Sequence, residues 1–301
     1  MTDARAGSGD EAFGRVRPLL FTVAYDVLGS AADAEDVVQD AWLRWSSADR
    51  AGVADAKAYL VRVATNLALD RLRSARARRE AYVGPWLPEP LLTAPDVADE
   101  VEVAEAVSMA LLVVLETLSP VERAVFVLRE VFGLSHREVA EALDRSEAAV
   151  RQLAHRAREH VDARRPRFVA DRRTRREVTE RFKAATLDGD VEALVASMSP
   201  GVTLLTDGGG RAKAARRPIV GARKVATFLA AVAAQGLTAP GLRVEVVDVN
   251  GAPAVAVWAG PSPLVVVQVQ VGESGLVEEV HVVLNPDKLA GLTAPRGLAV
   301  R

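Results

Sequence analysis

The chain carries SHREVAEALDRSEAAVRQLAHRAREHV over residues 135–161, which reads as two helices joined by a tight turn. Ser135 and Glu138 predict a capping box at the start of the first helix, and Ser146 is placed to cap the second. A short helix, a sharp turn and a longer helix are typical of a helix-turn-helix. A plain helical hairpin with a solvated basic face is the alternative.

The second helix of this pair has a polar outer face with basic and amide side chains. Arg151, His155 and Arg158 lie one turn apart on that face, and Gln152 lies beside them. Arginine and glutamine are side chains that bind guanine and adenine edges in the major groove. The pattern therefore predicts contact with DNA.

Composition limits the other kinds of site. The 301 residues are long enough for two or three domains, and half of them are hydrophobic. There is no cysteine, and the four histidines show no metal-ligand spacing, so we expect neither a metal nor a cofactor. The polar start and the short apolar runs predict a cytoplasmic protein without a signal peptide or a membrane span.

Charge is segregated along the chain. Residues 82–122 contain eight acidic residues and no basic one, whereas residues 145–176 contain eleven arginines and four acidic residues. This asymmetry favours a nucleic-acid-facing part beside an acidic connector. The net charge of −2 argues against strong DNA binding by the chain alone.

Apolar periodicity predicts helices over residues 11–28, 31–45, 56–79, 100–118 and 121–131. The third of these ends in a cluster of arginines. They are Arg71, Arg73, Arg76, Arg78 and Arg79. Cations stabilise the C-terminal end of a helix, but five in nine residues favour a surface that follows phosphates.

A proline-rich segment, GPWLPEPL at residues 84–91, ends this helical run. Its prolines exclude a regular element, and its large apolar side chains are expected to pack against another part of the molecule.

Three segments now show a resemblance. AEDVVQDAWLRW (34–45), AYLVRVATNLALDRLRSARARR (58–79) and LSPVERAVFVLREVFGLSHREVAEALDRSEAAVRQLAHRARE (118–159) resemble regions 2 and 4 of bacterial sigma factors of the extracytoplasmic-function (ECF) group. The resemblance covers roughly residues 11–161. It implies a subunit that directs core RNA polymerase to specific promoters, with promoter DNA and the largest-subunit clamp helices and flap of the polymerase as partners.

The resemblance also implies roles for individual residues. The clamp-binding residues would be Asp36, Gln39 and Asp40. Those at the −10 element would be Asn66, Arg62 and Arg73, with Asn66 in the pocket for a flipped base. Those at the −35 element would be Arg151, Gln152, His155 and Arg156. Plain structural alternatives are solvated carboxylates at Asp36 and Asp40 and a local hydrogen bond at Asn66; Trp42 and Trp45 are expected in the core.

The C-terminal third predicts an α+β fold. Helices are expected at 177–186, 191–198 and 221–235, and strands at 202–206, 242–249, 254–259, 264–271 and 277–284, in a curling antiparallel sheet. Asn250-Gly251 predicts a hairpin between two of the strands. This order resembles the cone-shaped NTF2-like fold of SnoaL-like polyketide cyclases and ketosteroid isomerases.

An enzyme of that kind needs a carboxylate base and a hydrogen-bond donor for the developing enolate. The three tyrosines, Tyr25, Tyr59 and Tyr82, lie outside this part of the chain. Asp207 precedes three glycines, which favours a turn, and His281 on a strand favours a structural role. We therefore predict no catalytic residue; a protein that also binds or isomerises a ketone is the alternative.

Three motifs, WLPEPL, DGGGR (207–211) and NPDKL (285–289), resemble the ECF41 type of sigma factor, which carries a fused SnoaL-like domain. That type implies regulation by the fused domain without a separate anti-sigma factor, and a possible small-molecule ligand in the domain's pocket. The expected interdomain residues are Trp86, Leu87, Pro88, Leu91, Asp207, Gly208, Gly209, Gly210, Asn285, Pro286 and Asp287. A classical DNA-binding regulator with a ligand pocket is a further alternative.

The predicted domains are thus a region 2 domain (8–80), an acidic linker (81–106), a region 4 helix-turn-helix domain (107–163), an arginine-rich connector (164–176) and a SnoaL-like regulatory domain (177–301). The fold class is multidomain, all-α followed by α+β.

Overall fold

The computed structural model describes residues 3–49, 52–94, 104, 106–164, 170–236, 241–296 and 298–299, apart from the side chains of residues 3–10, 76–80 and 236. Three arginines of the predicted basic cluster, Arg76, Arg78 and Arg79, therefore have side chains outside the description. Part of the acidic linker (95–103 and 105) and of the arginine-rich connector (165–169) also lies outside the described residues.

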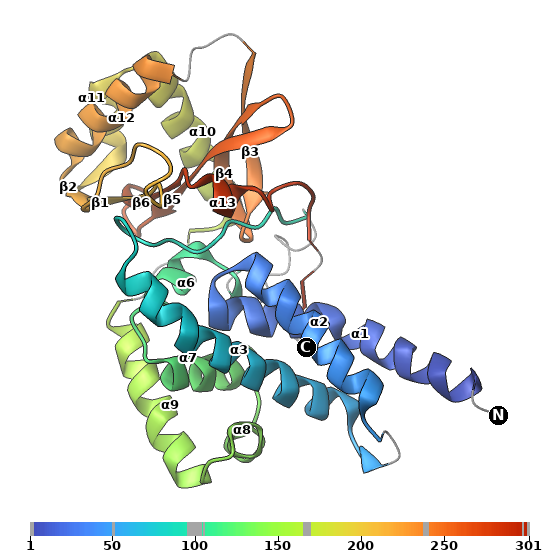
Figure 1. Cartoon of the computed structure of the whole chain (residues 1–301). Helices are drawn as coiled ribbons and strands as arrows, with labels where there is room; N and C mark the ends of the chain where they lie inside the picture. Colours follow the sequence, from blue (N-terminus) through green and yellow to red (C-terminus); the bar gives the residue numbers. More distant parts are fainter. Residues whose placement is uncertain are drawn as a thin grey trace.

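Three helices form the region 2 part, and Figure 1 shows them side by side. They are α1 (Asp3–Leu28), α2 (Ala31–Ser47) and α3 (Ala56–Glu80). The hydroxyl of Ser30 caps α2, and the Asp55 carboxylate accepts a hydrogen bond from the Ala58 N–H at the start of α3. Trp45 is buried, and Trp42 packs edge-on against Phe13, so both tryptophans belong to the core.

Four helices and a π-helical turn form the region 4 part. They are α6 (Met109–Leu115), α7 (Pro120–Phe126), the π-turn η2 (Val127–Val131), α8 (His136–Leu143) and α9 (Glu147–Asp162). The predicted capping box at Ser135 is present, and a second capping box lies at Ser119. Asp144 turns the chain between α8 and α9 with a left-handed backbone (φ 51°). The helix-turn-helix geometry is therefore confirmed.

The predicted helix over residues 100–118 is wrong in part. Ser108 has an extended backbone and caps a separate helix through the N–H of Leu111, so no single helix runs through this position. A serine that bonds its own backbone favours a helix start over a helix interior. Apolar periodicity alone did not distinguish the two.

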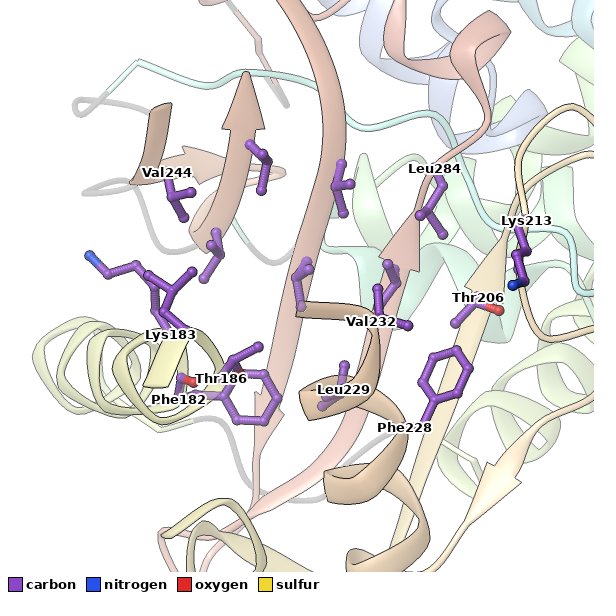
Figure 2. Close-up of a pocket in the computed structure, with 17 residues that line it drawn as sticks. Phe182, Lys183, Thr186, Thr206, Lys213, Phe228, Leu229, Val232, Val244 and Leu284 are labelled. Carbon is purple, nitrogen blue, oxygen red and sulfur yellow. Dashed lines mark hydrogen bonds between the residues drawn. The ribbon is translucent and has the colours of Figure 1, made fainter. Parts of the chain in front are cut away.

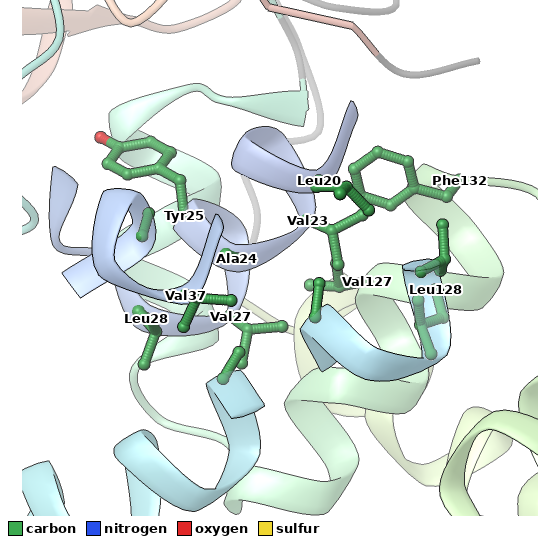
Figure 3. Close-up of a cluster of buried hydrophobic side chains, with 14 of the residues drawn as sticks. Leu20, Val23, Ala24, Tyr25, Val27, Leu28, Val37, Val127, Leu128 and Phe132 are labelled. Atoms are coloured by element: carbon green, nitrogen blue, oxygen red, sulfur yellow. The ribbon is translucent and has the colours of Figure 1, made fainter. Parts of the chain in front are cut away.

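Regions 2 and 4 share one continuous hydrophobic core. Leu20 and Val23 of α1 pack beside Val127 and Leu128 of η2 and the adjacent Phe132, as Figure 3 shows. Shared burial of this kind removes apolar surface of both parts from water and stabilises their association. The region 2 and region 4 parts are consequently held together.

The C-terminal part contains a six-stranded sheet and its covering helices. The elements are α10 (Arg172–Asp188), α11 (Val191–Ser197), β1 (Met198–Asp207), β2 (Ile219–Val220), α12 (Ala222–Gly236), β3 (Leu242–Val249), β4 (Ala252–Ala259), β5 (Ser262–Val271), β6 (Val277–Val283) and α13 (Pro286–Leu289). The strand order is β2-β1-β6-β5-β4-β3. This is the α+β, NTF2-like architecture that the sequence predicts.

Three details differ from the sequence-based expectation. The sheet is mixed, because β1 and β6 pair in parallel while the other neighbours are antiparallel. The short strand β2 was not predicted. Helix α10 begins at Arg172, five residues before the predicted start, because the Asp171 carboxylate caps it through the Thr174 N–H.

The two faces of the sheet pack against different parts of the chain. Side chains alternate along a strand, so Thr206 and Leu284 point toward the layer of α10 and α12, whereas Leu205 and Val283 point away from it. The second face packs against Leu87 of the linker. Figure 1 shows the linker running between the sheet domain and the helical part. We call this second face the linker face.

Candidate functional site

Asp207 lies at the end of β1 on the linker face, and its side chain is completely buried. One carboxylate oxygen accepts a hydrogen bond from the Tyr82 hydroxyl at 2.6 Å. The other accepts from the Leu87 backbone N–H at 2.8 Å and from the Lys288 ammonium at 2.7 Å. The carboxylate therefore joins the linker to the last helix of the sheet domain, and the turn interpretation of Asp207 is wrong.

Lys288 is the cation opposite this carboxylate. Its side chain is 7% exposed, and it also donates a hydrogen bond to the Leu87 carbonyl oxygen. The ammonium nitrogen lies 3.8 Å from the centre of the Trp86 ring and 5.0 Å from that of the Tyr82 ring. Buried charges are tolerated when they are paired and hydrogen-bonded, and aromatic faces stabilise cations further. We call Tyr82, Asp207, Asn285 and Lys288 the interdomain lock.

The Tyr82 phenol is the central neutral group of the lock. Burial raises the pKa of Tyr82 above its ordinary value, and the hydrogen bond to Asp207 raises it further. The phenol therefore stays protonated and donates to the carboxylate, while its oxygen accepts from the Asn285 side-chain amide at 2.8 Å. The phenol thus has a partner from the sheet domain both as a donor and as an acceptor.

Gly209 lies directly beneath these side chains. Its backbone is left-handed (φ 57°), and a Cβ atom placed there would lie 2.3 Å from Asn285 Nδ2 and 2.8 Å from the Tyr82 hydroxyl. The predicted neighbour Gly210 differs, because it is exposed and a Cβ there would meet only Val83 at 3.4 Å. Close approach of the linker therefore requires the first of these two glycines.

The rest of WLPEPL binds region 2. A Cβ added at Gly29, between α1 and α2, would lie 2.8 Å from the Trp86 ring, so the ring covers this turn. Glu89 caps α2 from outside: its carboxylate accepts from the Ser30 hydroxyl at 2.9 Å and from the Ala31 N–H at 2.7 Å. A carboxylate at a helix N-terminus interacts favourably with the helix dipole. Burial nevertheless raises the pKa of Glu89 above its ordinary value.

Asn250 makes a second buried junction. The predicted hairpin turn is present, and Asn250 has a left-handed backbone (φ 51°) and no exposed surface. Its side chain accepts from the Leu91 N–H at 3.0 Å and donates to the Tyr25 hydroxyl at 2.7 Å and the Val107 carbonyl at 2.8 Å. One amide therefore connects the sheet domain with the linker, region 2 and the start of region 4.

The segment after α13 returns to region 2. The Arg296 guanidinium pairs with the Glu35 carboxylate and lies 5.0 Å from the centre of the Phe21 ring. The Ala299 N–H donates to the Thr22 hydroxyl at 3.2 Å. The sheet domain thus contacts region 2 directly as well as through the linker.

The predicted −35 residues lie on the exposed face of α9. All four are exposed: Arg151, Gln152, His155 and Arg156. Arg151 pairs with Glu147 at 2.6 Å, and the other two basic side chains face Glu159 and Glu122 at 3.6 Å. Exposed ion pairs of this kind are weak, so they leave these side chains accessible to DNA.

The predicted −10 residues divide into two groups. The Asn66 side-chain amide is half-buried and donates to the Ala142 carbonyl at the end of α8, at 3.1 Å. Region 4 therefore covers the residue that the resemblance places in the base pocket. Arg62 and Arg73 remain exposed on α3.

The predicted polymerase-binding carboxylates meet an arginine of their own domain. Arg71 lies 2.9 Å from Asp36 and 2.8 Å from Asp40, and these hydrogen bonds raise the pKa of Arg71 above its ordinary value. Gln39 is exposed beside them. The carboxylates are thus partly neutralised on the surface of region 2.

Other predicted interdomain residues are placed less centrally. Leu87, Pro88 and Leu91 are buried as expected, whereas Pro286 and Asp287 are exposed at the start of α13. Gly208 is buried within its own loop, where a Cβ would meet the Ala212 carbonyl oxygen at 2.4 Å. Pro286 and Asp287 therefore shape the helix that carries Lys288 and do not face the linker.

Sequence reasoning missed four residues: Tyr82, Glu89, Asn250 and Lys288. Two of them had a usable signal, because Lys288 lies inside NPDKL and Glu89 inside WLPEPL. Asn250 was explained fully by its turn, and Tyr82 was excluded because it precedes the sheet domain in the chain. Their partners lie more than 100 residues away in the chain, so no local sequence signal indicated either contact.

The two residues considered for catalysis, Asp207 and His281, lie away from the cavity of the sheet domain. A small cavity of about 80 Å³ lies between the sheet and helices α10 and α12, on the face opposite the linker. Asp207 and His281 do not line this cavity; the linker face carries both. The lining residues include no carboxylate, histidine or tyrosine, so the described cavity offers no base or phenol for isomerase chemistry.

Within the described part of the chain, no group of three or more His, Asp or Glu side chains is placed to hold a metal ion. No helix of the described residues is both long and apolar enough to cross a membrane.

The described chain thus consists of a three-helix domain, a helix-turn-helix domain and an α+β sheet domain that contacts the linker and both helical parts. The sigma-70 region 2 model matches residues 12–78, and the sigma-70 region 4 model matches residues 108–161. The ECF RNA polymerase sigma factor SigJ of Mycobacterium tuberculosis is 45% identical over 221 residues, which cover 72% of this chain and 70% of that protein.

Two further comparisons extend over nearly the whole chain. The probable ECF RNA polymerase sigma factor SigI of the same species is 32% identical over 286 residues, 93% of this chain and 94% of that protein. The crystal structure of SigJ superimposes with a TM-score of 0.75 at 36% identity, covering 93% of this chain and 98% of that one. The chain belongs to the ECF RNA polymerase sigma factors.

The lock predicts a strong effect of Asp207→Asn. The substitution keeps the shape of the side chain but leaves the buried Lys288 without a counter-charge, which costs about 3–5 kcal/mol when one partner of a buried pair is removed. Urea unfolding followed by tryptophan fluorescence measures the loss. The matched control is Asp287→Asn, whose exposed side chain pairs with Arg211 at 3.5 Å and should change stability by less than about 0.5 kcal/mol. Equal effects of the two variants would contradict the assignment.

A pair of glycine variants tests close approach of the linker. Both Gly209→Ala and Gly210→Ala place a side chain at a left-handed backbone, but only the first also displaces Asn285 and Tyr82. Chymotrypsin cleavage after Tyr82 and Trp86 reports linker release. We expect Gly209→Ala to be cleaved roughly tenfold faster than Gly210→Ala, equivalent to about 1.4 kcal/mol of opening free energy. Indistinguishable cleavage rates would show that the contact with Asn285 and Tyr82 does not hold the linker.

Proposed function

We propose that this sigma factor directs core RNA polymerase to its promoters under the control of its own C-terminal domain, and that the described state is the inactive one. The observation that carries the proposal is the linker, whose residues are held by the interdomain lock on one side and by region 2 on the other. A linker fixed at both faces sets the distance between regions 2 and 4.

The proposed DNA contacts follow the two regions. Asn66, Arg62 and Arg73 would bind the −10 element, and the exposed residues of α9 would bind the −35 element. The hydrogen bond from Asn66 to Ala142 supports an inactive state, since region 4 occupies the side of α3 that the flipped base needs. Release of region 4 from region 2 is therefore required before both elements are bound together.

Core polymerase is the proposed activator. The clamp helices of its largest subunit would compete with Arg71 for Asp36 and Asp40, with Gln39 beside them, and its flap would bind region 4. To convert a protein that is 99% closed into one that is 99% open, a partner must bind the open state about 5.5 kcal/mol more tightly. Two separate binding surfaces on the polymerase are suited to supply such a difference.

Several finer properties follow from this proposal. The fused domain takes the part of an anti-sigma factor, so no separate one is needed, as in the ECF41 type. The protein would act in the cytoplasm, where it meets polymerase and promoter DNA. It would have no enzymatic activity, since the cavity lacks the residues of an isomerase.

Run-off transcription with core polymerase tests autoregulation. Asp207→Asn and Gly209→Ala weaken the lock without altering a predicted DNA or polymerase contact, so both should transcribe more strongly than the unmodified chain. Asp287→Asn and Gly210→Ala serve as matched controls and should transcribe like it. Equal output from all five proteins would rule out control by the lock, whereas no promoter-dependent transcript from any of them would rule out the proposed promoter recognition.

Energy transfer between two dyes tests opening directly. The chain has no cysteine, so Ser46→Cys in region 2 and Ser274→Cys in the sheet domain allow specific labelling of two exposed positions. Core polymerase should reduce transfer in the doubly labelled chain, and Asp207→Asn should reduce it even without polymerase. Unchanged transfer on formation of a transcriptionally active complex would contradict the opening step.

A further inference from the structure

We infer that the cavity of the sheet domain binds a small apolar molecule that carries one carboxylate group, and that this ligand stabilises the closed state. The inference rests on the proposed autoregulation for its effect on transcription, but not for binding itself. Its basis is the chemistry of the cavity lining and the position of that lining relative to the interdomain lock.

The cavity is apolar and larger than the space of a single water. Its volume of about 80 Å³ exceeds the roughly 10–15 Å³ that a single water needs. Most of the lining comes from side chains such as Phe182, Phe228 and Leu229 and from the valines of β3, β4 and β5, as Figure 2 shows. A lining of this kind binds hydrocarbon groups through the hydrophobic effect.

The polar groups of the lining select the charge of the ligand. The hydroxyl groups of Thr186 and Thr206 already donate to the backbone carbonyls of Phe182 and Ala215. The remaining polar side chains that line the cavity are two lysines, and no carboxylate lies among the described lining residues. An anion is therefore favoured over a cation in this cavity.

The two lysines are not equivalent. Lys183 lies on α10 and pairs with Glu180 at 2.5 Å, whereas Lys213 lies on the exposed loop after β1 and has no ion-pair partner among the described residues. Figure 2 shows the two lysines on different sides of the cavity. Lys213 is therefore the cation available to a bound carboxylate, while the apolar part of the ligand occupies the space between the sheet and α12.

The cavity and the lock share their backbone. Thr206 lines the cavity and Asp207, the next residue, holds the linker; Leu284 lines the cavity and Asn285 binds Tyr82. Successive strand residues point to opposite faces, so one shift of β1 or of the end of β6 moves both sites.

This arrangement also sets the direction of the effect. Lys213 belongs to the loop that begins with Gly208 and Gly209, and Asn285 and Tyr82 lie directly over Gly209 in the closed state. When the linker leaves the sheet domain, Tyr82 leaves with it, and the loop loses the contact of Gly209 with the Tyr82 hydroxyl. A ligand held by Lys213 therefore binds the closed state more tightly, and only such a difference in affinity shifts the equilibrium.

Calorimetric titration of the full chain with three probes of equal chain length tests the ligand class. Octanoate, 1-octanol and octylammonium share the apolar tail and differ in charge. We expect octanoate to bind about fivefold or more tightly than either of the others, because one charge-assisted hydrogen bond at a partly exposed site contributes about 1 kcal/mol. Equal affinities, or preference for octylammonium, would overturn the assignment.

Variants of the two lysines locate the carboxylate. Lys213→Met should lower the affinity for octanoate to that for 1-octanol, Lys213→Arg should retain most of it, and Lys183→Met should change it less than about threefold. Lys213 is exposed and Lys183 is half-buried at the edge of the domain, and an unchanged melting temperature without ligand confirms folding. Loss of octanoate binding in Lys183→Met but not in Lys213→Met would contradict the proposed site.

A further variant tests the cavity itself. Val267→Phe, which fills the cavity, should abolish binding of all probes; retained binding would place the ligand elsewhere.

Transcription provides the last test. Octanoate should reduce run-off transcription by the unmodified chain and should leave Lys213→Met unaffected, whereas activation by octanoate would overturn the stated direction.

The two proposals can be separated. If Asp207→Asn fails to raise transcription while octanoate still binds through Lys213, autoregulation is wrong and the ligand site stands; if the lock variants activate but no probe binds, the ligand site is wrong and autoregulation stands.

Discussion

The compact arrangement depends on one buried ion pair, Asp207 with Lys288. Neither charge is stable in an apolar environment alone, so the pair persists only where hydrogen bonds complete the shell of each group. Here the missing bonds come from the linker: the Tyr82 hydroxyl and the Leu87 backbone N–H bind the carboxylate, and the Leu87 carbonyl and the Trp86 ring bind the ammonium. The sheet domain is thus completed by a segment of the sigma part, which makes domain association a requirement of local electrostatics.

The linker is held at several points between the sheet domain and region 2. The linker connects regions 2 and 4, and it is fixed by the lock at Leu87, by α2 at Glu89 and by the β3–β4 turn at Leu91. Regions 2 and 4 meanwhile share apolar surface and the hydrogen bond from Asn66 to Ala142. The two sets of contacts are present in the same compact arrangement. Under the proposed autoregulation, the exposed face of α9 would bind DNA together with region 2 only after opening.

Local signals predicted most of the fold. The capping box at Ser135, the tight turn of the helix-turn-helix and the Asn250-Gly251 hairpin all depend on residues within a few positions of one another, and all are present. The failures had two different origins, one local and one long-range. The predicted helix over 100–118 ignored the capping preference of Ser108, and the parallel pairing of β1 with β6 joins strands more than 70 residues apart, which side-chain alternation cannot distinguish from an antiparallel pair.

The sequence by itself determined the class of protein, the order of its helices and strands, and the segments WLPEPL, DGGGR and NPDKL as places of contact, because periodicity, capping and motif spacing are properties of neighbouring residues. Only the tertiary structure decided which atoms of those segments meet. It placed Lys288 opposite Asp207, brought Tyr82 to a domain that begins long after it in the chain, and put Asp207 on the face of the sheet opposite the cavity. Charge compensation in a buried site depends on distances and directions in space, and these are fixed only when the domains pack.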